Sequence, residues 1–370
     1  MSAEDPAIVI RRLMEEHAQH VAKFGHVPAP VTIHHQGKAV VAVGRRLLID
    51  ERWNSFHDFL FTYIGTIFEQ SWFAEELKKL FEAQHPIMQW YQMLADFGAA
   101  RGVERGKLTK IEKPAAHVIA LLTFAYDLYI LENNGLLHPR LVDRLKRIDQ
   151  FQGARYEAYV TAAFVKAEFA VVLEDEADTS TSHCEFTATH RASGKAYSVE
   201  AKSRVRSGFL GQAGARKPLE QIEADMSGLL VNALRKAAAH DRIVFIDINI
   251  PPSEAPTPEA GWFQKLGSQF ARLAKNQQGA PLLPAFVFFT NAPYHFIEGD
   301  SPLRGASILF TGFNIPEFEG ESADQEVIRT KYSQVLELYD SLLRHNGVPH
   351  ELGRPGGPSE DDEQTIRGEP

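Results

Sequence analysis

An acid and a lysine two residues apart give the clearest sign of chemistry in this sequence. They are Glu200 and Lys202, in a segment, residues 197–202, whose apolar and polar alternation predicts a strand. Side chains at positions i and i+2 of a strand project to the same face, so the carboxylate and the ammonium should share one site. Burying such a pair is unfavourable unless each group has a further partner, so a metal ion or a phosphate explains it better than stability does.

A basic segment follows this pair. The chain has no acid between Glu200 and Glu220, and three glycines interrupt the segment. Two interpretations remain open: a flexible loop whose charges face solvent, or a mobile basic loop that covers an anionic ligand. The basic residues are Lys202, Arg204, Arg206, Arg216 and Lys217.

Composition and charge narrow the class of protein. With 370 residues, of which 44% are hydrophobic, the chain is long enough for two domains or one large elaborated domain. Its formal net charge of −9 argues against a general polyanion binder. The single cysteine, Cys184, excludes an internal disulfide and a cysteine-based zinc cluster. No secretory signal or membrane-spanning segment is visible, so we expect a cytoplasmic protein that does not contact a membrane.

Helical periodicity dominates residues 1–150, which we expect to form a mainly helical domain with a short β-hairpin. The hairpin is predicted at residues 31–35 and 38–43, and helices at residues 8–24, 54–70, 72–83, 87–100 and 112–133. The many aromatic residues at helical spacing are more typical of a core than of a ligand site. An interface for a second copy of the chain or for a protein partner is the alternative role for this domain.

Strands and helices alternate after residue 150, a pattern that favours an α/β architecture for residues 151–346. The elements are predicted in the order helix 153–168, strands 169–173, 184–190 and 196–202, helix 218–239 and strand 243–250. A helix at 262–276, strands at 285–290 and 307–310, and a helix at 323–345 follow. Residues 347–370 combine prolines, glycines and an acidic run, which predicts a disordered acidic tail.

Residues 153–250 resemble the PD-(D/E)xK superfamily, the restriction-endonuclease-like nucleases and resolvases. The order of elements is similar to that family's, and Glu200 with Lys202 matches its acid-x-lysine triplet. Glu157 matches the glutamate of the family's first helix. Glu185 matches the first metal-binding acid, and Asp178 is the alternative for that position. The resemblance implies a mixed-sheet αβββαβ core, extended by additional C-terminal α/β elements.

The same resemblance implies a metal site and a division of roles. Glu185, Glu200 and the backbone carbonyl of Ala201 would bind Mg²⁺ or Mn²⁺, because such hard cations prefer oxygen ligands. Lys202 would activate the attacking water or stabilise the transition state, and Glu157 would bind a second ion or a water molecule. Contacts to the phosphates of nucleic acid are expected from Arg155, Arg204, Arg206, Arg216 and Lys217.

The resulting hypothesis is a Mg²⁺-dependent DNA endonuclease whose helical N-terminal domain recognises the substrate or a partner. By analogy with the family, such a combination suits bacterial restriction or anti-phage defence. The alternative is a catalytically inactive module that keeps the fold as a scaffold for a protein or nucleotide partner. Metal uptake that depends on Glu185 and Glu200 distinguishes the two hypotheses.

Overall fold

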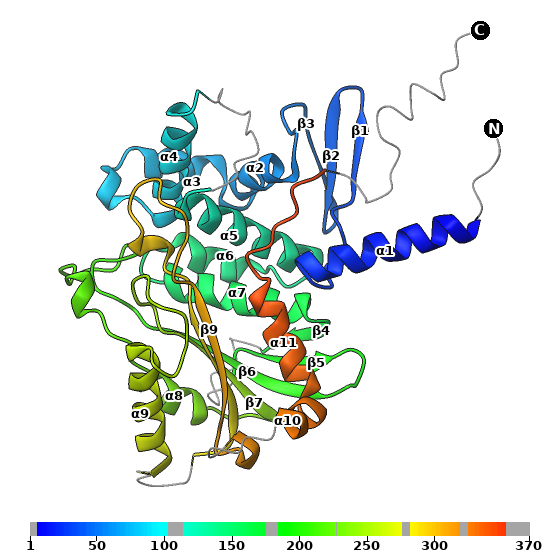
Figure 1. Cartoon of the computed structure of the whole chain (residues 1–370). Helices are drawn as coiled ribbons and strands as arrows, with labels where there is room; N and C mark the ends of the chain where they lie inside the picture. The colour runs from blue at the N-terminus through cyan, green and yellow to red at the C-terminus, as the bar shows by residue number, and fades with distance from the viewer. Residues whose placement is uncertain are drawn as a thin grey trace.

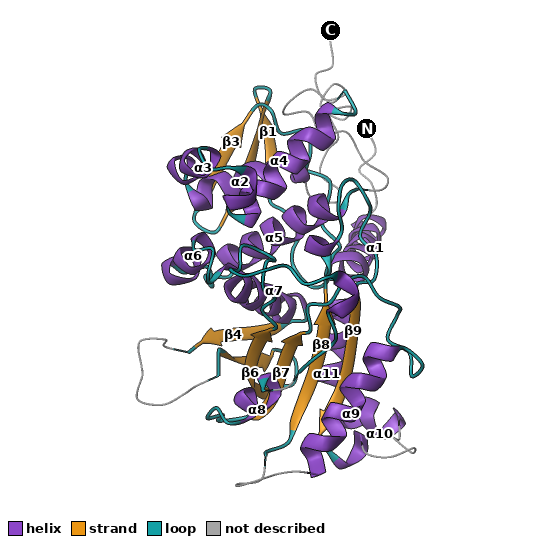
Figure 2. Cartoon of the chain, turned by 90° about the vertical axis from the view of Figure 1, so that its left-hand side faces the viewer, coloured by secondary structure: helices purple, strands orange, loops and turns teal. Residues whose placement is uncertain are grey.

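The computed structural model describes residues 6–102, 114–174, 184–226, 228–275, 282–318 and 325–352. Within them, a helical N-terminal region precedes a six-stranded mixed sheet, and further helices follow towards the C-terminus (Figures 1 and 2). Asp178 and most of the expected tail lie outside the described residues. No helix in the described ranges is long and apolar enough to cross a membrane.

The N-terminal region begins with a helix and a small antiparallel sheet. The predicted hairpin is confirmed as β1 and β2, and a third strand, β3, pairs with β2. The elements are α1 (Pro6–Phe24), β1 (Thr32–His35), β2 (Lys38–Val43), β3 (Arg46–Asp50), α2 (Phe56–Phe68), α3 (Gln70–Leu77), α4 (Pro86–Ala99), α5 (Ala116–Asn133) and α6 (Pro139–Lys146). The sequence pattern predicted neither β3 nor α6.

Local sequence explains where the central helices of this region begin and what they bury. Helix α2 starts at a capping box, in which Ser55 accepts a hydrogen bond from the Asp58 backbone while the Asp58 side chain accepts from the Ser55 backbone. Helix α5 is buried over most of its length, and its neighbours α2 and α4 pack against it. The aromatic residues of α2 lie in this core, as their spacing predicted.

Helix α7 (Phe151–Lys166) connects the helical region to the sheet. Ala154 and Ala158 belong to the helical core, whereas Val160 and Phe164 pack on the sheet. The four lie on two sides of one helix, since residues three or four apart share a face. Helix α7 is therefore common to both hydrophobic cores.

The six-stranded sheet follows the order β4-β5-β6-β7-β8-β9. Strands β4, β5 and β6 are antiparallel neighbours, β6, β7 and β8 run parallel, and β9 is antiparallel to β8. The strands are β4 (Phe169–Leu173), β5 (Phe186–His190), β6 (Ala196–Ser203), β7 (Asp241–Asp247), β8 (Ala285–Asn291) and β9 (Ser307–Phe313). The predictions for these six segments are confirmed to within a few residues.

The two faces of the sheet have different coverings. On one face, Val199 and Phe245 pack with α7 and with α11 (Ser333–Leu343). On the other, Val244 and Ile246 pack with α8 (Leu229–Leu234) and α9 (Gly261–Lys275). Because side chains alternate along β6, Glu200 and Lys202 project to the face covered by α8.

The prediction of a long helix at residues 218–239 is wrong. The chain forms a single 3₁₀ turn (Leu219–Gln221), continues without regular structure to residue 226, and forms only the short α8. Arg206 donates to the backbone carbonyl of Glu223, and Arg204 donates to that of Asp225. These side chains bind carbonyl groups that a continuous helix would use itself, so long-range contacts override the local helical pattern.

The C-terminal part also differs from its prediction. The helix expected at residues 323–345 is divided into α10 (Gln325–Lys331) and α11, with Tyr332 between them. Residues 347–352, which the sequence placed in the tail, lie against the helical region, where the backbone carbonyl of His350 accepts a hydrogen bond from Phe56 at 2.7 Å. Val348 and Leu352 pack against the same core.

Candidate active site

Four charged side chains meet beside β6. Glu200 and Lys202 come from β6 itself, Glu185 stands directly before β5, and Lys236 follows α8. Pairing of the Glu185 backbone N–H with the carbonyl of Val199 at 2.9 Å brings Glu185 alongside this part of β6. We call these four residues the carboxylate–lysine cluster.

The distances within the cluster are those of ion pairs. Lys202 contacts Oε1 of Glu200, and its Nζ lies 3.7 Å from Oε1 of Glu185. Lys236 Nζ lies 2.8 Å from Oε1 of Glu200 and 3.5 Å from Oε1 of Glu185. The predicted convergence of Glu185, Glu200 and Lys202 is thus present in the structure, with a second lysine added to it.

Glu200 is more deeply buried than either lysine of the cluster. Its side chain is 1% exposed, whereas those of Lys202 and Lys236 are 26% and 20% exposed. Burial raises the pKa of Glu200, the negative charge of Glu185 raises it further, and the two lysines act in the opposite direction. For Lys236, burial lowers the pKa, but the attraction of Glu185 and Glu200 outweighs it and the net shift is upward.

The carboxylate of Glu200 has an oxygen that is available to bind a cation. Oε1 of Glu200 is already paired with the ammonium groups of Lys202 and Lys236, whereas Oε2 is buried without a hydrogen-bond partner among the described residues. A carboxylate with unused lone pairs beside a second carboxylate is a suitable ligand pair for Mg²⁺ or Mn²⁺. In the described ranges, no group of three or more His, Cys, Asp or Glu side chains is arranged to hold a metal.

The charges of the cluster also predict when a divalent cation would bind. Two carboxylates and two ammonium groups cancel, so a divalent ion added alone would leave a net positive site. An anionic phosphate would restore the balance, since opposite charges at close range favour each other. The residues therefore fit a metal ion that enters together with an anionic substrate better than one that binds alone.

Glu157 lies elsewhere. It forms an ion pair with Arg144 of α6, in which Oε2 is 2.8 Å from Nη1. Its helix, α7, covers the face of the sheet to which Val199 points, whereas Glu200 points to the other face. The structure therefore does not bring Glu157 to the carboxylate–lysine cluster.

Two of the basic residues fasten the segment that follows β6. Arg206 donates to the carbonyls of Ile248 and Asn249 at 2.9 Å, and Arg204 lies 3.3 Å from a carboxylate oxygen of Asp225. Gly211 touches the helical region, with a φ of +75° and no space for a side chain beside Ile148. The first part of this segment is thus held to the strand ends by its own arginines.

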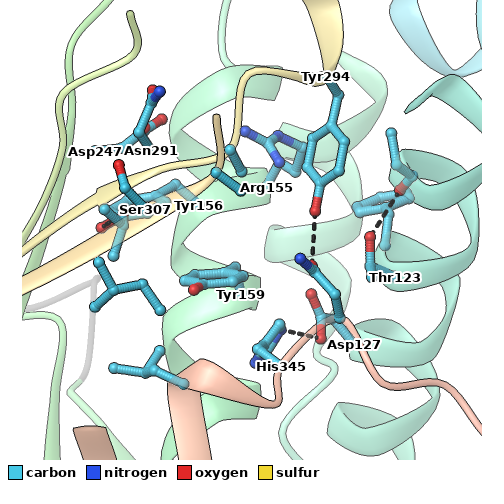
Figure 3. Close-up of a pocket in the computed structure, with 18 of the residues that line it drawn as sticks. Thr123, Asp127, Arg155, Tyr156, Tyr159, Asp247, Asn291, Tyr294, Ser307 and His345 are labelled. Carbon is cyan, nitrogen blue, oxygen red and sulfur yellow. Dashed lines mark hydrogen bonds and ion pairs between the residues drawn. The ribbon is translucent and has the colours of Figure 1, made fainter. Parts of the chain in front are cut away.

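The remaining basic residues are dispersed. Arg216 lies over the ring of Phe209 and donates to the carbonyl of Gly208 at 3.4 Å, and Lys217 is exposed. Arg155 projects from α7 into a cavity that also contains Asp247 (Figure 3). The five residues predicted to contact phosphate therefore do not form one continuous patch with the cluster.

Lys236 is the member of the cluster that the sequence did not reveal. It lies 34 positions after Lys202, inside a segment whose pattern predicted a helix. Its place depends on how α8 packs against β6 and β7. No local spacing carries that information.

Comparison with family models, with curated proteins and with solved structures finds no match. Any functional conclusion therefore depends on the site itself.

Proposed function

We propose that this protein is a metal-dependent nuclease that hydrolyses phosphodiester bonds in DNA. The observation that carries the proposal is the meeting of Glu185, Glu200 and Lys202 within ion-pair distance at the centre of a mixed sheet. The order α7, β4, β5, β6, α8 and β7 supports it, since it resembles the αβββαβ core of restriction-endonuclease-like enzymes.

Each residue of the cluster has a role in this proposal. Glu185 and Glu200, with the carbonyl of Ala201, would hold Mg²⁺, which when bound polarises a phosphate oxygen and lowers the pKa of a coordinated water. Lys202 is part exposed, so its ammonium can reach a phosphate oxygen on which negative charge develops. Lys236 is a positioning residue, because it holds the side chain of Glu200 and offsets its buried charge.

The chemical step is a hydrolysis. The oxygen of water forms a bond to phosphorus, the bond from phosphorus to the leaving sugar oxygen breaks, and the proton of the water passes to solvent or to the leaving oxygen. Lys202 donates hydrogen bonds to the oxygens that carry charge in this step. A donor placed where charge develops accelerates such a reaction more than one that binds the ground state equally well.

One observation favours a second function, that of a catalytically inactive binding module. The four charges of the cluster already neutralise each other, so the fold keeps them without any ligand. In that case the cluster would be a structural network and the protein a scaffold for a partner. Titration with Mn²⁺ in the presence of an oligonucleotide separates the two functions, because only a metal site takes up the ion in a manner that requires Glu185 and Glu200.

A substrate panel tests the proposal. The full chain is incubated with supercoiled plasmid, linear duplex, single-stranded DNA and RNA, each with Mg²⁺ and with a chelator. We expect cleavage of DNA in Mg²⁺ and none in the chelator. Cleavage of RNA alone would refute the choice of DNA, and cleavage that persists in the chelator would refute the metal dependence.

A further inference from the structure

A cavity with several polar groups in its wall lies at the carboxyl ends of the parallel strands (Figure 3). Its volume is about 160 Å³. Asp247 of β7 and Asn291 of β8 line it from the strand ends, and Arg155 and Tyr159 line it from α7. Ligands of open α/β sheets bind in the crevice outside the carboxyl ends of parallel strands, so the location is suitable for a binding site.

The cavity and the cluster lie on opposite faces of the sheet. The hydroxyl of Ser203 donates to Oδ2 of Asp247 at 2.8 Å on the side of α7. Lys202, the preceding residue of β6, projects to the side of α8. A ligand in the cavity would therefore not contact the residues assigned to the nuclease site.

Most acceptor groups in the wall already have donors. Oδ1 of Asp247 accepts from the Asn249 backbone at 3.2 Å, and Oδ1 of Asn291 accepts from the Ile250 backbone at 3.0 Å. At the other end of the cavity, Asp127 lies 2.8 Å from Nε2 of His345. The carboxylates of the wall are thus held by the protein and need no cation.

Besides the ring of His345, which faces Asp127, the described part of the wall has two side chains with an unpaired donor. Nε of Arg155 and the hydroxyl of Ser307 are both buried without a hydrogen-bond partner among the described residues. A buried donor left unpaired is unfavourable, so a ligand that supplies acceptor oxygens would be stabilised there. The guanidinium fork matches the paired oxygens of carboxylates and phosphates.

The size of the cavity limits the ligand. A volume of about 160 Å³ has room for several water molecules. Pockets for drug-sized molecules are larger, at about 300–1,000 Å³. The space is therefore sufficient for a small ion with a few waters and too small for a nucleic acid chain.

We propose that this cavity binds a small oxyanion, a phosphate or a carboxylate, through Arg155 and Ser307. The charge of Arg155 is opposed by Asp247 in the same cavity, but the oxygens of Asp247 are directed to Ser203 and Asn249. The Nε–H group of Arg155 therefore remains for the ligand. This inference does not depend on the nuclease proposal.

Calorimetric titration of the full chain in a chelator tests the inference. The probes are inorganic phosphate and acetate, with chloride at equal ionic strength as the control. We expect saturable binding of one or both oxyanions, a loss of at least about tenfold in Arg155→Met, and a smaller loss in Ser307→Ala. Lys202→Ala, on the other face of the sheet, should bind as the parent does.

Three results would overturn the inference. They are binding of neither oxyanion beyond that of chloride, unchanged affinity in Arg155→Met, and a loss of binding in Lys202→Ala, which would place the anion on the other face. If Arg155→Met does not fold, the parent protein still decides the question. Phosphate or acetate must then protect Arg155 from labelling by phenylglyoxal, as read by mass spectrometry, and labelling at an unchanged rate contradicts the site.

Discussion

The same triplet, an acid, any residue and a lysine, occurs at the C-terminal end of helix α3 and in strand β6, with different geometries. In α3, Glu76 and Lys78 do not pair with each other. Glu76 pairs with Lys79 and accepts a hydrogen bond from the buried backbone N–H of His85 at 2.8 Å, while Lys78 pairs with Glu75 at the surface. Residues two apart on a helix point in different directions, so the triplet divides into two separate contacts.

In β6 the acid and the lysine of the triplet contact each other. Glu200 and Lys202 lie on one face and contact each other, and Lys236 and Glu185 complete the cluster. The comparison shows that the spacing of an acid and a lysine has chemical meaning only together with the period of the element that carries it. The helical triplet also provides matched control variants for tests of the strand triplet.

The largest contrast is expected when the two glutamates are each replaced by glutamine. Glu200→Gln removes a proposed metal ligand, so cleavage should fall by at least about 10²-fold. Glu76→Gln keeps an acceptor for the buried His85 backbone and loses only the charge that pairs with Lys79, so cleavage should be unchanged and stability should fall by about 1–2 kcal/mol. Cleavage rates and urea unfolding measure both effects, and equal activity of Glu200→Gln and the parent would remove Glu200 from the site.

A smaller contrast is expected in the pH dependence of stability without metal. Burial and the charge of Glu185 raise the pKa of Glu200 in the folded state, so the folded protein binds the proton more tightly than the unfolded chain does. Stability should therefore fall as pH rises from the ordinary pKa of a glutamate through the raised folded value.

Urea unfolding in a chelator, at several pH values in the mildly acidic range, measures this slope. Glu200→Gln cannot titrate and should lose the contribution of Glu200, so its stability should vary less with pH than that of the parent. Parallel pH profiles for the parent and Glu200→Gln would show that Glu200 ionises normally in the fold.

The smallest effect concerns Lys236. Lys236→Gln removes one positive charge from the cluster, so Mn²⁺ should bind more tightly in the absence of nucleic acid, by roughly threefold to tenfold. Lys236→Arg keeps the charge and should show no gain. Calorimetry without DNA measures the affinity, and weaker binding in Lys236→Gln would contradict the charge balance described for the cluster.

The part of the site that could be predicted from the sequence is the part with local order. The period of a strand places Glu200 and Lys202 on one face without any further information, and the succession of strands brings Glu185 beside them. The same reasoning locates the strands of the sheet, because their apolar segments are bounded by turns and charged residues.

What could not be predicted depends on contacts between distant parts of the chain. Lys236 reaches the cluster from just after the short helix α8, and Arg204 and Arg206 bind backbone carbonyls in the irregular segment before that helix. Arg155 follows from its place on α7, but its cavity is formed by the ends of β7 and β8. Neither arrangement can be recognised from the spacing of residues within a single helix or strand.

The most direct test of the central claim is single-turnover cleavage of a labelled DNA duplex in Mg²⁺ by the parent, Lys202→Ala and Lys78→Ala side by side. Both variants lose a lysine from an acid-x-lysine triplet, and both positions are at least partly exposed. The account predicts no cleavage by Lys202→Ala and parental rates for Lys78→Ala, with circular dichroism spectra like that of the parent. Cleavage by Lys202→Ala at the parental rate would contradict it.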